Sequence, residues 1–233
     1  RWQSPRVEVA SVYVEQFPGD KDLARRRIRR HDLKAFPTIS EALTLGGNKL
    51  AVDGVVLIGE HGEYPRNDLG QKLYPRHKWF KEIVKVFEAS GRSVPVFNDK
   101  HLSTSWDECA EMVQDSRRLK FPFLAGSSLP VTWRLPMVDM PFNAPLQESV
   151  CVAYGGVDSY DFHALETAQC MSERRGGGEV GIRSVHAVRD ENLWQLLEQK
   201  GNTVTRELMI AALTRSHNLP VEGGFPTGRV TYE

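Results

Sequence analysis

The chain has 233 residues, which is enough for one large domain or two small ones. Its 30 lysines and arginines balance 30 aspartates and glutamates, so the overall charge argues against nucleic acid or an anionic membrane as a partner. Three cysteines at wide spacing argue against a disulfide framework, and no apolar run approaches the ~18 residues needed to span a bilayer. We therefore expect a soluble, cytoplasmic protein.

The first part of the chain alternates between strand and helix patterns. Val7–Val14 is the first expected strand. Asp20 or Asp22 is expected to cap a helix over residues 23–30, whose five arginines we interpret as a solvated helix face. Thr38 and Glu41 have the spacing of a capping box, which predicts a second, short helix.

Three short apolar runs then predict buried parallel strands. They are Val52–Ile58, Val94–Phe97 and Phe121–Ala125, and two amphipathic helices over residues 78–90 and 105–119 separate them. This βαβαβ order predicts a right-handed parallel sheet. Each run ends in a burst of polar residues. Because ligands of an open α/β sheet bind outside the carboxyl ends of its strands, we expect these bursts to form one site.

The composition changes after residue 129. Four prolines between residues 130 and 145 indicate a linker or an extended crossing. Beyond it we expect strands over residues 149–154 and 181–188 and helices over residues 162–173, 194–199 and 206–215. The prediction is an α/β protein. It has an incomplete Rossmann-like parallel sheet in residues 1–129 and a second, smaller α/β unit in residues 130–233.

Two segments carry a family resemblance. Residues 91–100 read GRSVPVFNDK, and residues 155–163 read GGVDSYDFH before a helix pattern. In this order they resemble the "GKHV-EKP" segment and the glycine-rich turn of the Gfo/Idh/MocA oxidoreductases. The resemblance implies that Lys100 matches the family's lysine and His163 its substrate-facing histidine. It also implies that Glu15, at the end of the family's second strand, binds a ribose hydroxyl of NAD(P).

The chain departs from this family at two points that matter for chemistry. The family's Gly-x-Gly-x-x-Gly turn, which holds the pyrophosphate, should follow a strand before residue 7, and this sequence does not contain it. The family's Glu-Lys-Pro is replaced by Asp99, Lys100 and His101. The second-domain sheet of the family is also incomplete here, so a homo-oligomer that completes it between protomers remains open.

Several ligand-type side chains follow predicted strand ends or start a helix. Two imidazoles and a carboxylate are enough for a catalytic metal site with an open position. The candidate ligands of a divalent metal, either zinc, calcium or manganese, are His61, Asp99, His101 and His163. The structural alternatives are a turn residue at His61, a helix cap at Asp99 and a simple helix start at His163.

Lys100 and Glu60 are the candidates for proton transfer. A lysine desolvated beside His101 has a lowered pKa and serves as a base, whereas a solvated or ion-paired lysine has only a structural role. Glu60 lies two residues after the predicted strand Val52–Ile58.

Three functions remain open from the sequence. The first is a small-molecule enzyme that acts on a polar, oxygen-rich substrate, such as a sugar derivative or lactone, by metal-assisted hydrolysis or elimination. The second is an NAD(P)-dependent sugar oxidoreductase in which Lys100 and His163 handle the proton of the alcohol. The third is a non-catalytic binding or assembly module, which would show saturable binding without turnover.

Overall fold

The computed structural model describes residues 7–134 and 136–215, so the glycine- and proline-rich tail after residue 219 lies outside the described residues. The chain divides into two units, residues 1–127 and 128–233, and each is described by itself. Parallel strands with helices between them confirm the predicted α/β class. Among the described residues, no helix combines the length and apolar character needed to cross a membrane.

The strands of the first unit form two parallel sheets. The smaller sheet pairs β1 (Val12–Tyr13) with β2 (Ala35–Phe36). The larger sheet has the order β3-β4-β5 and consists of β3 (Val55–Leu57), β4 (Val96–Asp99) and β5 (Phe123–Gly126). The parallel arrangement predicted from the three apolar runs is therefore confirmed. The strand β2 was not expected, because two residues are too few to produce an alternating pattern.

Three α-helices of the first unit begin beside a side chain that accepts hydrogen bonds from their first backbone amides, whereas α3 begins after Pro75 with no side-chain cap. The side chain of Asp22 accepts hydrogen bonds from the first backbone amides of α1, and Thr38 accepts one from Glu41 at the start of α2. Ser105 caps α4 in the same way. The unit contains a short 3₁₀ turn η1 (Gly19–Lys21) and the helices α1 (Ala24–Arg30), α2 (Ile39–Thr44), α3 (Arg76–Ser90) and α4 (Trp106–Arg118).

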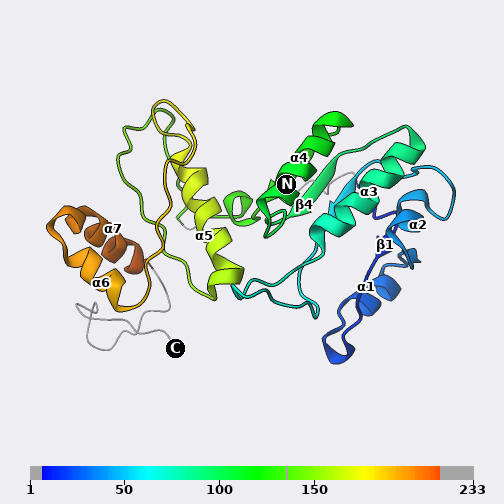
Figure 1. Ribbon diagram of the computed structural model, residues 1–233, viewed down its shortest axis with the longest axis horizontal. Coiled ribbons are helices and arrows are strands. Elements are labelled where there is room, and N and C mark those ends of the chain that lie inside the picture. The colour runs from blue at the N-terminus through cyan, green and yellow to red at the C-terminus, as the bar shows by residue number, and fades with distance from the viewer. Residues whose placement is uncertain (1–6, 135, 216–233) are drawn as a thin grey trace. The chain divides into compact units, whose positions relative to one another are not determined.

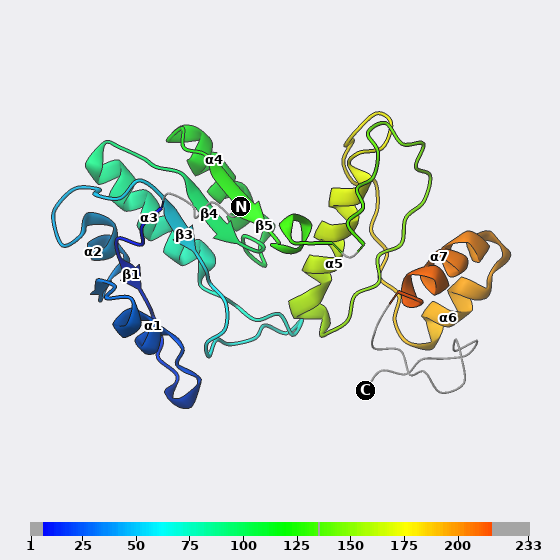
Figure 2. The ribbon, with the colours of Figure 1, turned by 180° about the vertical axis from the view of Figure 1, so that it is seen from behind.

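The core of the first unit lies between the larger sheet and one pair of helices. Figure 1 shows α3 and α4 in front of this sheet, and Figure 2 shows β3, β4 and β5 in front of the two helices. Phe80 and Phe87 of α3, Met112 of α4 and Val96 of β4 are almost fully buried. On the opposite face of the sheet, the neighbouring side chains in register are exposed: Val56, Phe97 and Leu124.

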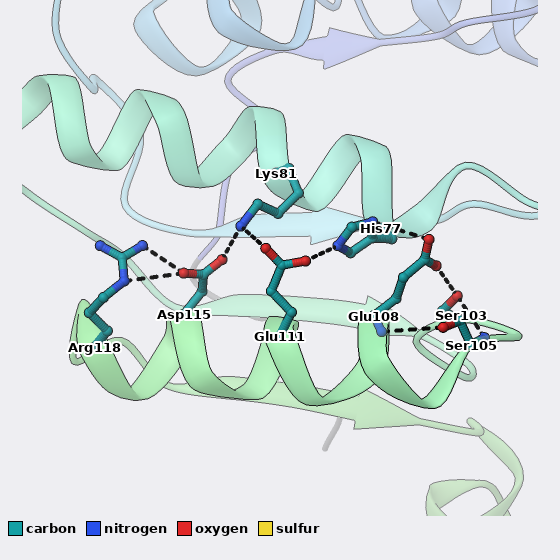
Figure 3. A network of polar contacts seen from close by, with 8 residues as sticks. All are labelled: His77, Lys81, Ser103, Ser105, Glu108, Glu111, Asp115 and Arg118. Atoms are coloured by element: carbon teal, nitrogen blue, oxygen red, sulfur yellow. Dashed lines mark hydrogen bonds and ion pairs between the residues drawn. The ribbon is translucent and has the colours of Figure 1, made fainter.

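A network of charged side chains joins α3 to α4 (Figure 3). Lys81 of α3 lies 2.7 Å from a carboxylate oxygen of Glu111 and 2.6 Å from one of Asp115, both on α4. His77 lies 2.7 Å from Glu111, and Arg118 lies 2.6 Å from Asp115. Because Asp115 is largely buried, its charge depends on these two cationic partners. The network therefore joins the two helices through charged side chains.

The described part of the second unit is built from helices. They are α5 (Val157–Ser172), α6 (Glu191–Glu198) and α7 (Thr203–Leu213), with the 3₁₀ turns η2 (Leu129–Val131) and η3 (Lys200–Asn202). The strands predicted at residues 149–154 and 181–188 are wrong: neither segment is part of a strand. Their apolar side chains, including Tyr154, Ile182 and Val185, are exposed. Apolar alternation alone does not make a strand where no neighbouring strand pairs with it.

Candidate functional site

The carboxyl ends of β3, β4 and β5 lie side by side at one edge of the larger sheet. Glu60 follows β3, and Asp99 is the last residue of β4. The backbone N–H of Lys100, the next residue, donates to the carbonyl of Gly126 in β5 over 2.9 Å. All three strand ends therefore contribute to one small region within the first unit.

The ammonium group of Lys100 lies between two carboxylates. Its Nζ atom forms an ion pair with Oε2 of Glu60 and lies 2.8 Å from Oδ2 of Asp99. The Lys100 side chain is only 14% exposed. Burial alone would lower the pKa of Lys100, but the hydrogen bonds to Asp99 and Glu60 outweigh it and raise the pKa above its ordinary value. Lys100 is therefore an ammonium at neutral pH, not the neutral base that desolvation alone would produce.

Beside this cluster, a buried arginine contacts His101. Arg76 begins α3 and is 2% exposed, and its Nη1 atom lies 2.9 Å from Nε2 of His101. An arginine side chain can only donate hydrogen bonds, so Nε2 of His101 is the acceptor. The Arg76 guanidinium also lies over the ring of Tyr74, 4.5 Å from its centre. The hydrogen bond leaves the proton of a neutral His101 on Nδ1.

A glycine at the end of β3 makes room for this arginine. A Cβ atom added at Gly59 would lie 2.7 Å from Cγ of Arg76 and 3.4 Å from the ring of Trp79. The shorter separation is below any normal carbon–carbon contact. Glycine at position 59 therefore leaves the space that the Arg76 side chain occupies beside the end of β3.

The loop between β3 and α3 is fixed to β1 through Glu15. Its carboxylate accepts hydrogen bonds from the hydroxyl of Tyr64 over 2.8 Å and from Nε1 of Trp79 over 3.2 Å. Burial and the hydrogen bond to Glu15 raise the pKa of the Tyr64 hydroxyl, so Tyr64 remains a donor. Next to Glu15, Gln16 exchanges two hydrogen bonds with the backbone of Glu63. Glu15 therefore has a structural role here, and its contact with a ribose of NAD(P) stays a prediction.

The four metal-ligand candidates are not gathered around one point in the first unit. Asp99 is neutralised by Lys100, His101 uses Nε2 toward Arg76, and His61 is exposed with a left-handed backbone (φ +64°). His163 lies in α5 of the second unit. Residues 7–134 and 136–215 hold no group of three His, Cys, Asp or Glu side chains arranged for a metal. The Lys100 ammonium lies between the carboxylates of Glu60 and Asp99. These two carboxylates therefore pair with a lysine side chain here and not with a metal ion.

Sequence reasoning missed two residues of this region. Arg76 received no role because the expected helix begins at residue 78, whereas α3 begins at Arg76. Asn98 begins the polar burst after the predicted run Val94–Phe97 and received no role, but in the structure it lies within β4 and is completely buried. Its position two residues after Val96, on the inner face of the strand, is the sequence signal that could have identified it.

No protein-family model, curated protein or solved structure matches this chain.

Proposed function

We propose that the chain is an enzyme that acts on a polar, oxygen-rich small molecule, such as a sugar derivative or a lactone, by hydrolysis or elimination. The observation that carries this proposal is the Lys100 ammonium held between Glu60 and Asp99 at the carboxyl edge of the parallel sheet. Open α/β sheets bind their ligands at this edge. Three charged groups in a partly shielded position there are typical of catalysis.

The Lys100 ammonium is suited to stabilise negative charge on a substrate oxygen. An ammonium has three N–H donors, and Glu60 and Asp99 use two of them. The third can donate to a substrate carbonyl, on which negative charge develops in both hydrolysis and elimination. A donor that is already in place and already charged favours that transition state over the ground state.

Glu60 is the candidate base. Its side chain is 27% exposed, which makes it more accessible than Asp99 at 16%. In hydrolysis, Glu60 takes a proton from the water that attacks the lactone carbonyl carbon, the ring C–O bond breaks, and protonated Glu60 returns the proton to the leaving alkoxide. In elimination, Glu60 takes the proton from the carbon next to the carbonyl, the C–O bond on the adjacent carbon breaks, and protonated Glu60 gives the proton to the leaving hydroxyl, which departs as water. Asp99 then keeps the positive charge of Lys100 balanced while Glu60 is protonated.

The charge balance of the whole chain favours a small molecule over nucleic acid or a membrane surface as the partner. A divalent metal, NAD(P), cytoplasmic location and a homo-oligomer stay predictions from the sequence.

A turnover assay with matched lysine variants tests the proposal. Purified protein is incubated in D₂O with a panel of aldonolactones and hydroxy-carboxylic acids, and ¹H NMR follows ring opening, loss of water and exchange of the proton next to the carbonyl. We expect turnover of at least one compound, and Lys100→Met should lower kcat/KM by about 10²- to 10⁴-fold. Glu60→Gln should lower kcat by a similar factor, because it removes the base.

Lys85→Met is the control, since Lys85 is an exposed lysine of α3 whose ion pair is with Glu82 on the same helix. It should keep native kcat and KM. Turnover of a panel compound by Lys100→Met at the native rate would contradict the proposal, as would saturable binding of a compound that is never converted. The second result would favour the binding module.

A further inference from the structure

Asn98 occupies a position where the fold calls for an apolar side chain. It follows Val96 by two residues in β4, and both lie on the inner face of the sheet, while Phe97 between them lies on the outer face. Asn98 is 0% exposed. A buried amide is unfavourable unless its hydrogen bonds are made, so its presence calls for an explanation.

The amide group of Asn98 is directed at the backbone that carries Lys100. Its Nδ2 atom lies 3.4 Å from the carbonyl oxygen of Asp99, 3.1 Å from that of Lys100 and 3.3 Å from that of His101. Carbonyl oxygens only accept hydrogen bonds, so the NH₂ end of the amide must face them. The Oδ1 atom of Asn98 is buried and makes no hydrogen bond within the described residues. The contacts of the Asn98 side chain are therefore made by its NH₂ group and not by its oxygen.

The backbone of Lys100 needs such support. Lys100 has a left-handed conformation (φ +70°), which a residue with a side chain adopts only when its surroundings enforce it. Its N–H is fixed by the carbonyl of Gly126 in β5, and its carbonyl is fixed by Asn98. The two bonds hold the peptide groups on both sides of the Lys100 Cα atom.

We propose that Asn98 is a positioning residue that holds Lys100 in this left-handed conformation and thereby keeps its ammonium between Glu60 and Asp99. Asn98 acts through the backbone and does not touch the substrate. The inference rests on the proposed function of Lys100, but its test needs no substrate, so the two can fail separately.

The test is the reactivity of the Lys100 amine in the full chain. Folded protein is labelled with trace acetic anhydride at several pH values, and mass spectrometry quantifies acetylation of each lysine. In the native protein, Lys100 should react at least tenfold more slowly than the exposed Lys85, because it is shielded and remains protonated. In Asn98→Ala we expect Lys100 labelling to rise by about tenfold or more, since the amine reacts only when it leaves the two carboxylates and becomes accessible.

Val96→Ala is the matched control. It truncates a buried side chain on the same face of the same strand and leaves the amide of Asn98 in place. General weakening of the fold should raise the labelling of Lys100 equally in both variants, whereas a positioning role predicts the rise only in Asn98→Ala. Asn98→Thr serves if the alanine variant does not fold, because threonine suits a strand and its single hydroxyl donor can satisfy only one of the three carbonyls. It should give an intermediate rise.

Native labelling of Lys100 in a folded Asn98→Ala or Asn98→Thr variant would overturn the inference, and so would an equal rise in Val96→Ala. If Lys100→Met keeps full turnover while Asn98→Ala still releases the Lys100 amine, the proposed function fails and the positioning role stands.

Discussion

The guanidinium of Arg76 donates a hydrogen bond to Nε2 of His101 across 2.9 Å, in a position where the arginine is almost completely buried. The acceptor role of Nε2 defines which nitrogen of a neutral His101 carries the proton. It also keeps the imidazole beside Lys100 from offering this nitrogen to a metal. Through this contact, a residue at the beginning of α3 determines the protonated nitrogen of a histidine just after β4.

We predict that neutral His101 is protonated on Nδ1. Long-range ¹H–¹⁵N NMR at about pH 8 should show an unprotonated Nε2, because Arg76 occupies it as a donor. The variant Arg76→Met should remove this preference, and the exposed His61 is the internal control that should not change. A native spectrum with the proton on Nε2 of His101 would contradict the contact.

Replacing Gly59 should disturb the same arginine. Gly59→Ala places a Cβ atom 2.7 Å from Cγ of Arg76, so we expect a loss of about 1–3 kcal/mol in the free energy of unfolding. Gly54→Ala is the matched control just before β3, where the nearest atom, the carbonyl oxygen of Pro95, is 3.8 Å from the added Cβ. Urea unfolding of both variants measures the difference. Equal stability of the two would argue against close packing of Arg76 at β3.

These residues show what the sequence could predict and what it could not. Apolar runs located β3, β4 and β5 within a few residues, and the spacing of Thr38 and Glu41 located the start of α2. Hydrophobic patterning and local capping are short-range signals. The contact between Arg76 and His101 joins positions 25 residues apart, and no periodicity encodes it.

The same limit applies to the site and to the second unit. The order of the strands predicted that Glu60, Asp99 and Lys100 lie at one edge, but whether Lys100 becomes a base or a paired ammonium depends on distances that only the structure supplies. In the second unit, the sequence predicts strands around Tyr154 and Ile182 because these segments are rich in apolar residues. The structure shows that both side chains are exposed, and the local sequence carries no signal of that exposure.

Asp115 should make stability depend on pH. Burial alone would raise its pKa, but hydrogen bonds from Lys81 and Arg118 outweigh burial and hold the pKa below its ordinary value. A carboxyl group with a lowered folded-state pKa stabilises the protein above its unfolded-state pKa, near 4, and this contribution is lost as the pH falls through the folded-state pKa.

The variant Asp115→Asn tests this sign. At pH 7 we expect it to lower the free energy of unfolding by about 1–3 kcal/mol, because Lys81 and Arg118 each lose a charged partner. The loss should shrink at acidic pH, below the ordinary pKa of an aspartate, where native Asp115 begins to be protonated. Asp53→Asn is the control: Asp53 pairs with Arg92 but is 99% exposed, so its removal should change stability little at any pH. Chemical unfolding at several pH values measures both, and a pH-independent loss in Asp115→Asn would contradict the ion-pair explanation.

The capping box of α2 gives a smaller prediction. Thr38→Ala removes the acceptor for the backbone N–H of Glu41 and the hydroxyl that donates to the Glu41 carboxylate, so thermal unfolding should show a loss of about 1 kcal/mol. Thr38→Ser should restore most of the loss because it keeps the hydroxyl. A serine variant as unstable as the alanine variant would assign the effect to the lost methyl group.

Titration of the Lys100 amine is the most direct measurement of whether this lysine works as a permanent ammonium. NMR of ¹³C-dimethylated lysines in the native protein and in Glu60→Gln gives its pKa. We predict that native Lys100 has a pKa above the ordinary value of a lysine, because Asp99 and Glu60 stabilise its charge, and that Glu60→Gln lowers this pKa. A native Lys100 with a pKa below the ordinary lysine value would contradict the ammonium role and restore the neutral base that desolvation alone would produce.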